Sequence, residues 1–266
     1  MTMDPVARKT FLEQYATIRH AEGRGSEDRA FYNALPWRDL TGKNAEQWAI
    51  RARSYRRFER TVLADLERET GRPLDILDLG AGTGWMSHRL ALRGHKPVAV
   101  DIFLDARDGL RAIHQFSLPL AGVAAEFDRL PFGDASFDLV VFNSSLHYSS
   151  DYTRTLTEAR RCLRPAGVVA VVDSPVYKLP EHGERMRAER QAHFERTYGF
   201  RSDALGSIEY LDEPVLGRLS RELGIRWTRR RTWYGWRWAL RPLRARLKGG
   251  RPPSSFIILA GRFGNP

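Results

Sequence analysis

The sequence is poor in cysteine and has no long apolar segment. Cys162 is the only cysteine among 266 residues. This excludes an internal disulfide and any metal cluster built on several cysteines, and it is typical of a reducing compartment. No run approaches the roughly 18 apolar residues of a membrane-spanning helix, and the first ten residues have no apolar signal core. We therefore expect a cytoplasmic protein.

Acidic residues are missing from the end of the chain. The net charge is +11, and all of this excess lies between Leu223 and Pro266, where there are eleven basic residues and no acidic one. The rest of the chain is neutral. A nucleic-acid binder that used its whole surface would be expected to spread its charge more widely.

The segment 236–252 is a basic extension that mixes Trp, Leu and Arg. On a helix, one face would carry Trp236, Leu240, Leu243 and Leu247. Three interpretations stay open: peripheral contact with an acidic membrane surface, contact with nucleic acid, or a solvated extension between two strands. The third is favoured, with its tryptophans packed inward. Pro242 breaks the helical pattern unless a helix begins near it.

Hydrophobic periodicity predicts an α/β domain over residues 71–266. Short apolar runs typical of buried strands alternate with helical runs at 85–93, about 105–115 and 152–163, which indicates a parallel sheet wound on both faces. The strand candidates are 74–79, 97–101, 120–126, 137–142 and 167–173. Two further strands, about 225–234 and 255–262, are expected to form a hairpin. Residues 1–70 are predicted to be a helical cap, and 175–211 an insert that covers the substrate.

A glycine-rich turn, Asp78-Leu-Gly-Ala-Gly-Thr-Gly84, follows the first strand of this core. Its glycines let the backbone approach a ligand closely, and the next helix points its free N–H groups at that ligand. The dinucleotide fingerprint G-x-G-x-x-G needs a small third residue. Trp85 occupies that position, so the spacing argues against a dinucleotide.

Four more motifs follow in order. An apolar strand ends in Asp101-Ile102, about 20 residues beyond the glycines, where a carboxylate can accept hydrogen bonds from a ribose diol. Next come Glu126-Phe127 before Leu-Pro-Phe, then Asp-Ala-Ser-Phe-Asp-Leu-Val-Val-Phe-Asn143, and finally Leu-Arg-Pro-Ala-Gly167.

Over about residues 74–173 these motifs resemble the type 11, small-molecule branch of the class I methyltransferases that use S-adenosylmethionine (SAM). The resemblance implies a doubly wound, Rossmann-like sheet of seven strands with an antiparallel last strand. It also implies SAM as cofactor, no metal, and a small-molecule acceptor methylated at oxygen, nitrogen or carbon. Glu126 departs slightly from the family, in which many members carry Asp.

The resemblance also implies a set of site residues. The expected cofactor site consists of Asp78, Gly80, Ala81, Gly82, Gly84, Asp101, Ile102, Glu126, Phe127 and Asn143. His147 is the best-placed candidate for a catalytic base. Trp37, Trp48 and Tyr148 are expected to contact the acceptor, although simple packing of the N-terminal helices is the favoured alternative for the two tryptophans.

Three other functions stay open. One is a lipid or quinone methyltransferase held at a membrane by the basic extension. Another is a nucleic-acid methyltransferase, which is disfavoured because Asn143-Ser-Ser-Leu146 lacks the Asn/Asp-Pro-Pro-aromatic motif of enzymes that methylate base amino groups. The third is a SAM-binding protein without transfer activity.

Overall fold

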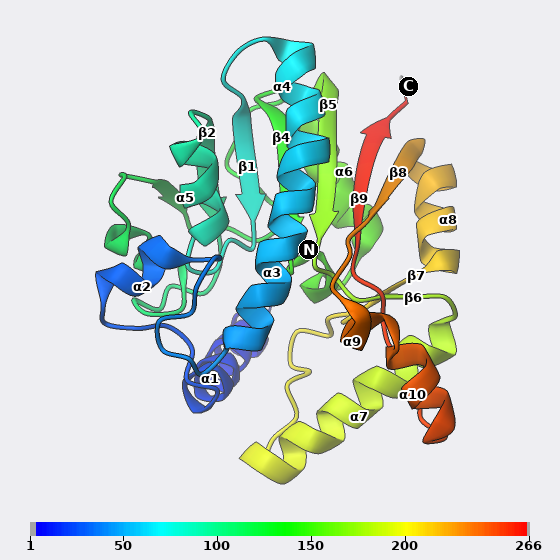
Figure 1. The fold of residues 1–266 in the computed structure, drawn as a ribbon. Coiled ribbons are helices and arrows are strands. Elements are labelled where there is room, and N and C mark those ends of the chain that lie inside the picture. Colours follow the sequence, from blue (N-terminus) through cyan, green and yellow to red (C-terminus); the bar gives the residue numbers. More distant parts are fainter. Residues whose placement is uncertain (1–3, 265–266) are drawn as a thin grey trace.

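The computed structural model describes residues 4–264 and has a seven-stranded sheet with helices on both faces (Figure 1). The strand order is β3-β2-β1-β4-β5-β9-β8. The strands are β1 (Asp75–Leu79), β2 (Lys96–Val100), β3 (Ala121–Val123), β4 (Phe137–Asn143), β5 (Leu163–Val172), β8 (Ile225–Arg231) and β9 (Ile257–Phe263).

All strands but one run in the same direction. β1 to β5 pair in parallel, whereas β9 is antiparallel to both β5 and β8. The prediction of a doubly wound sheet with an antiparallel last strand is confirmed. The carboxyl ends of β1, β2, β4 and β5 therefore meet at one edge, where Leu79 pairs with Val100 and Phe142.

The sheet separates two hydrophobic cores because successive strand residues point to opposite faces. Ile76 and Leu139 pack against helices α3 (Ala45–Phe58) and α5 (Trp85–Leu92). Leu77 and Val140 pack on the other face against α6 (Tyr152–Cys162) and α8 (Glu213–Leu223). Cys162 is buried in this second core, as expected of a small apolar filler.

The N-terminal region is helical, as predicted. It contains α1 (Pro5–Ala21), α2 (Arg29–Ala34), α3, a π-helical turn (Glu59–Leu63) and α4 (Ala64–Thr70). Tyr55 and Phe58 of α3 are buried in the same core as the strands. The helices from α2 onward thus complete the sheet's own core, while α1 lies across its carboxyl edge (Figure 1).

The helix predicted at 105–115 is wrong in its first half. A turn precedes a 3-10 helix that covers only Leu110–Gln115. The Asp105 carboxylate accepts the N–H groups of Arg107 and Asp108 at 2.8 Å each, which favours a turn over a helix. β3 is likewise shorter than the predicted 120–126.

The insert and the basic extension lie near one another at the lower edge in Figure 1. The insert contains β6 (Val176–Tyr177), α7 (Pro180–Tyr198) and β7 (Leu211–Asp212). The extension forms α9 (Trp236–Ala239) and α10 (Arg241–Leu247), so a helix does begin beside Pro242. No helix in the described range 4–264 is long and apolar enough to cross a membrane.

The expectation of inward-packed tryptophans in the extension holds for only one of them. Trp238 packs against Tyr234 and Phe256, at ring-centroid distances of 4.8 and 5.4 Å. Trp236, by contrast, is 75% exposed. The reason is geometric: neighbours two positions apart on a helix point about 200° apart, so both cannot face the protein.

Candidate functional site at the carboxyl edge of the sheet

A cavity of about 440 Å³ opens at the carboxyl edge of the sheet. Its walls include Gly80 and Gly82 after β1, Asp101 after β2, and Ser144 and Ser145 after β4. In doubly wound sheets ligands bind outside the carboxyl ends of the strands. The size is in the usual range for a small-molecule site.

Gly80 and Gly82 of the turn both have positive φ but differ in what surrounds them. Gly80 has φ +72°, and a Cβ there would lie 2.3 Å from the Cβ of Ser145. Ser145 is held in place because its Oγ donates to the Leu79 carbonyl at 2.5 Å. Gly82 has φ +55°, and no heavy atom lies within 4 Å of the point that a Cβ would occupy, so its α-carbon faces open space at the cavity wall.

Ala81 and Gly84 lie behind the turn rather than in the cavity wall. Ala81 packs with Leu110 and Ile113. A Cβ on Gly84 would lie 2.7 Å from Cγ2 of Ile113. These two small residues let the turn approach the 3-10 helix closely, so their contribution to the site is indirect.

Asp101 is the acidic residue of the cavity wall that follows β2 directly. Its two carboxylate oxygens accept the N–H groups of Gly82 and Phe103, each at 2.8 Å. Burial raises the pKa of Asp101. Each oxygen keeps a lone pair that can accept a hydroxyl group of a ligand.

Asp78 and Asn143 lie beneath the cavity. Oδ2 of Asp78 accepts the Ser87 hydroxyl at 2.7 Å, and burial raises the pKa of Asp78 to about 7. Oδ1 of Asp78 and Oδ1 of Asn143 are buried without a hydrogen-bond partner in the described part of the chain. Neither residue contributes to the cavity wall itself.

Ile102, Glu126 and Phe127 line the cavity beside Asp101. Phe127 packs edge-on against Phe142 with a centroid distance of 5.7 Å. Apolar and acidic groups thus alternate along this wall, which suits a ring with an exocyclic donor.

Helix α1 covers one side of the cavity, and the sequence did not predict that its residues line the site. Phe11 and Tyr15, one helical turn apart, face the cavity. The Tyr15 ring packs edge-on against Phe103 at 5.1 Å and against Tyr148 at 6.1 Å. The aromatic spacing i, i+4 in the mildly amphipathic 5–20 region was the only signal for them.

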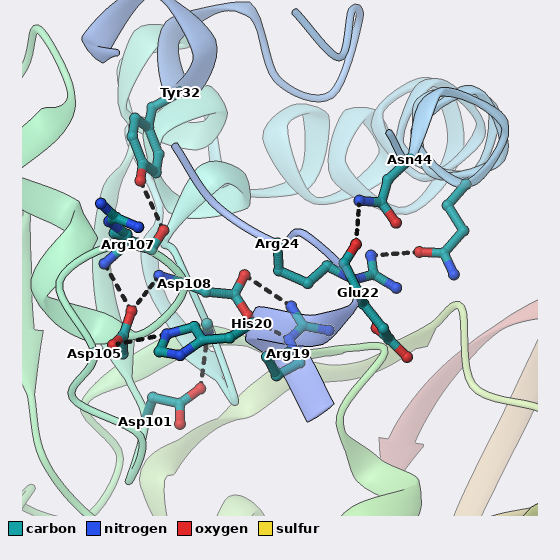
Figure 2. Close-up of polar contacts among 12 residues, drawn as sticks. Arg19, His20, Glu22, Arg24, Tyr32, Asn44, Asp101, Asp105, Arg107 and Asp108 are labelled. Atoms are coloured by element: carbon teal, nitrogen blue, oxygen red, sulfur yellow. Dashed lines mark hydrogen bonds and ion pairs between the residues drawn. The ribbon is translucent and has the colours of Figure 1, made fainter. Parts of the chain in front are cut away.

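Figure 2 shows what holds the end of α1 in place. Arg19 forms a two-point ion pair with Asp108, with one N–O distance of 2.8 Å. His20 lies 3.6 Å from Asp105. The hydroxyl of Tyr32 donates toward the carbonyl of Arg107 at 2.7 Å. The loop after β2 therefore connects Asp101 to the helix that covers it.

The structure brings one of the three predicted acceptor contacts to the cavity. Tyr148 lines it. Trp48 is buried against Trp85 with a centroid distance of 5.9 Å, and Trp37 packs on Tyr55 while remaining 40% exposed. Neither tryptophan lines the cavity, and the geometry matches the packing alternative.

A second polar cluster lies beyond the ends of β4 and β5. Asp173 accepts a hydrogen bond from Ser54 of α3, whose hydroxyl is also 2.7 Å from that of Tyr234. Burial raises the pKa of Asp173 to about 6, and Ser54 and Arg51 oppose this rise. Ser54 thus links α3 to the tip of β5.

Arg51 is a partly buried cation in the same region. Its guanidinium lies 4.8 Å from the centre of the Trp48 ring. Burial, with Arg19 and Arg24 nearby, lowers the pKa of Arg51 to about 10. Within residues 4–264, no carboxylate lies at ion-pair distance from Arg51.

His147 is only 8% exposed and is not part of the cavity wall. Its Nδ1 lies 3.3 Å from the Ser174 hydroxyl. Burial, then Arg190 and Arg51, lower the pKa of His147 to about 3. Such an imidazole is neutral near pH 7 but is a weak base. Its surroundings therefore do not favour proton abstraction.

Residues 77–171 match the model of a family described as "Methyltransferase domain". A malonyl-[acyl-carrier protein] O-methyltransferase of Hahella chejuensis is 30% identical over an alignment of 158 residues, and the match covers 52% of this chain and 54% of that protein. An uncharacterised methyltransferase of Mycobacterium bovis is 40% identical over 97 residues, covering 36% of this chain and 38% of that one. The chain thus spans about half the length, or less, of these curated relatives.

Solved structures share the fold. A Galdieria sulphuraria protein, provisionally assigned as a sarcosine dimethylglycine methyltransferase, matches 94% of this chain and 98% of its own with a TM-score of 0.59 and 16% identity. The YcgJ protein of Bacillus subtilis matches 78% of this chain and 100% of its own with a TM-score of 0.54 and 15% identity. At these identities the likeness concerns the fold alone.

Proposed function

Residues 77–171 match a family described as "Methyltransferase domain", and from this premise we propose that the protein is a class I SAM-dependent methyltransferase that methylates a small-molecule acceptor. The observation that carries the proposal is the cavity at the carboxyl edge of the sheet. Its wall combines an open glycine, Gly82, with a partly buried carboxylate, Asp101, at neighbouring strand ends. A nucleoside with a cationic tail suits such a wall better than a pyrophosphate does.

The cofactor site would use these residues as follows. Asp101 would accept hydrogen bonds from the ribose hydroxyls, and Ile102 and Phe127 would contact the adenine ring. Glu126 would accept a hydrogen bond from the adenine amino group. The backbone of 80–82 would face the methionine end. The bound cofactor supplies an electrophilic methyl group, so the protein mainly has to align the acceptor and exclude water.

We propose that the acceptor binds next to the ends of β4 and β5, between Tyr148 and Arg51. A partly buried guanidinium without a carboxylate at ion-pair distance favours an acceptor that carries a negative charge. The name of the Hahella relative specifies O-methylation of a malonyl group on a carrier protein. For this chain a carboxylate or another small anion is the class of acceptor that Arg51 would suit.

Catalysis in this proposal depends on positioning rather than on a strong base. An anionic oxygen needs no deprotonation, which agrees with the low pKa of His147. We assign the His147 side chain a role in positioning the 144–150 segment, since its Nδ1 lies 3.3 Å from the Ser174 hydroxyl. In the same segment the backbone carbonyl of His147 accepts the N–H of Glu209 at 2.7 Å. That contact ties the segment after β4 to the insert.

Incubation with methyl-labelled SAM and fractionated cell extract tests the proposal. Label in the small-molecule fraction, and its loss when anionic metabolites are removed by anion exchange, would support it. Label in RNA, DNA or lipid would contradict a small-molecule acceptor and identify another class of acceptor. Tight SAM binding with no label in any fraction would refute transfer activity.

A further inference from the structure

An apolar stripe runs along the solvent side of the basic extension. We define the stripe as Trp233, Trp236, Leu240, Leu243 and Leu247. Leu247 is 78% exposed and Trp236 75%, and the other three are also exposed. The rings of Trp233 and Trp236 touch edge-on at 5.0 Å. Large apolar side chains exposed at successive helical turns are typical of an interaction site.

Four cations flank the stripe. Arg237, Arg244, Arg246 and Lys248 are all exposed. In the part of the chain that the structure describes, none of the four has a carboxylate at ion-pair distance. On a helix they lie on both sides of the apolar residues, so their aliphatic stems and charged heads border the stripe.

The stripe is held outward by the opposite face of the two helices. Trp238 packs against Tyr234 and Phe256, and the guanidinium of Arg241 lies 3.5 Å from the centre of the Trp238 ring. Arg241 also donates to the Ser254 carbonyl at 2.6 Å. Because this face is anchored, the stripe cannot turn inward without breaking these contacts.

We propose that α9 and α10 bind an anionic lipid surface, with the stripe inserted at the headgroup boundary. Tryptophan and leucine on one face with Arg and Lys beside them is the pattern of interfacial helices. A second copy of this chain would bring unbalanced cations together, which repel. Nucleic acid would engage the cations but would leave three leucines unburied.

The fold places this surface at the same edge as the cavity. β8 runs parallel to β5, so its end at Arg231 and the helices that follow lie on the carboxyl side of the sheet (Figure 1). Arg251, just after α10, forms an ion pair with Glu189 of α7 at 2.8 Å. Docking would therefore bring the insert and the acceptor side near the lipid.

Vesicle flotation of the full chain tests the proposal. We expect binding to phosphatidylcholine vesicles that contain about one third phosphatidylglycerol and no binding to phosphatidylcholine alone. Replacing Arg237 and Arg244 by Ala should weaken binding by roughly tenfold or more, since each basic residue near such a surface contributes about fivefold. Leu243→Asp should weaken it to a similar degree.

Matched controls separate a specific surface from net charge and from folding. Arg57→Ala with Arg60→Ala removes the same charge from exposed positions elsewhere, and Leu92→Asp alters a leucine that is 51% exposed against 54% for Leu243. Both controls should bind vesicles like the parent. All variants should keep the parental SAM affinity, so failure here is distinguishable from failure of the proposed function.

Several outcomes would overturn the proposal. These are no binding to anionic vesicles at 50 mM salt, equal losses in the control variants, or a dimer in sedimentation that only Leu243→Asp dissociates. Binding to RNA or DNA in place of the vesicles would do so too.

Discussion

Gly82→Ala adds one methyl group to the glycine turn where the structure leaves open space. No heavy atom lies within 4 Å of the new Cβ, so the substitution creates no clash in the free protein. Its cost to folding comes from the backbone, because φ is +55° and a left-handed residue with a Cβ costs about 1–2 kcal/mol. The melting temperature should fall by a few degrees.

The effect on the cofactor should be larger. If the backbone at Gly82 faces bound SAM, the added methyl group occupies space that SAM needs. It would therefore move SAM away from the Gly82 backbone and the Asp101 carboxylate. The loss of one hydrogen bond to a charged group corresponds to about 1.5–3 kcal/mol, or roughly 10- to 150-fold in Kd. Isothermal titration calorimetry with SAM and with S-adenosylhomocysteine measures this change in Kd.

Gly71→Ala is the matched control. Gly71 ends α4 with φ +64°, and no heavy atom lies within 4 Å of its Cβ position either. The strain is the same, but Gly71 lies at the other edge of the sheet and not in the cavity wall. This variant should melt a few degrees lower and bind SAM within twofold of the parent. Equal SAM affinity of both variants would refute the placement of the cofactor against the turn.

Three other substitutions probe the acidic groups and the histidine. Asp101→Ala should weaken SAM binding by about 1–3 kcal/mol in the same titration, and unchanged affinity would mean that the carboxylate does not hold the ribose. Burial raises the pKa of Asp78 from 3.8 to about 7, so the folded protein retains a proton that the unfolded chain releases; stability is lost as pH rises between these values. Urea unfolding from pH 4 to 7.5 should therefore show the parent losing stability relative to Asp78→Asn, and a pH-independent difference would contradict the raised pKa. His147→Gln should keep the rate of methyl transfer within about tenfold of the parent, and neither protein should show an inflection near pH 6.5 in its pH–rate profile. A loss of 100-fold or more would instead indicate that His147 acts as the catalytic base.

The fold could be predicted from the sequence because the signals are local and repeated. The alternation of apolar strands with helices, from Leu74 to Val172, is visible without any tertiary information. Boundaries failed where side chains compete with the backbone, as at Asp105, whose carboxylate caps a turn inside a predicted helix.

The acceptor side was less predictable because its residues come from distant segments. Ser54 of α3 meets Asp173 after β5, 119 positions away in the chain. Phe11 and Tyr15 reach the cavity because distant contacts, such as the ion pair of Arg19 with Asp108, hold their helix there. Such contacts depend on how whole helices are placed, which no window of sequence contains.

By itself the sequence determined the class of fold, the glycine turn and the order of the acidic groups at the strand ends, because each of these is a property of a few adjacent residues. The tertiary structure decided which aromatic residues line the cavity and which only pack. It also decided that Arg51 is partly buried with no carboxylate at ion-pair distance in the described chain, and that the stripe from Trp233 to Leu247 faces solvent. The physical reason is that burial and pairing arise from the packing of segments far apart in sequence.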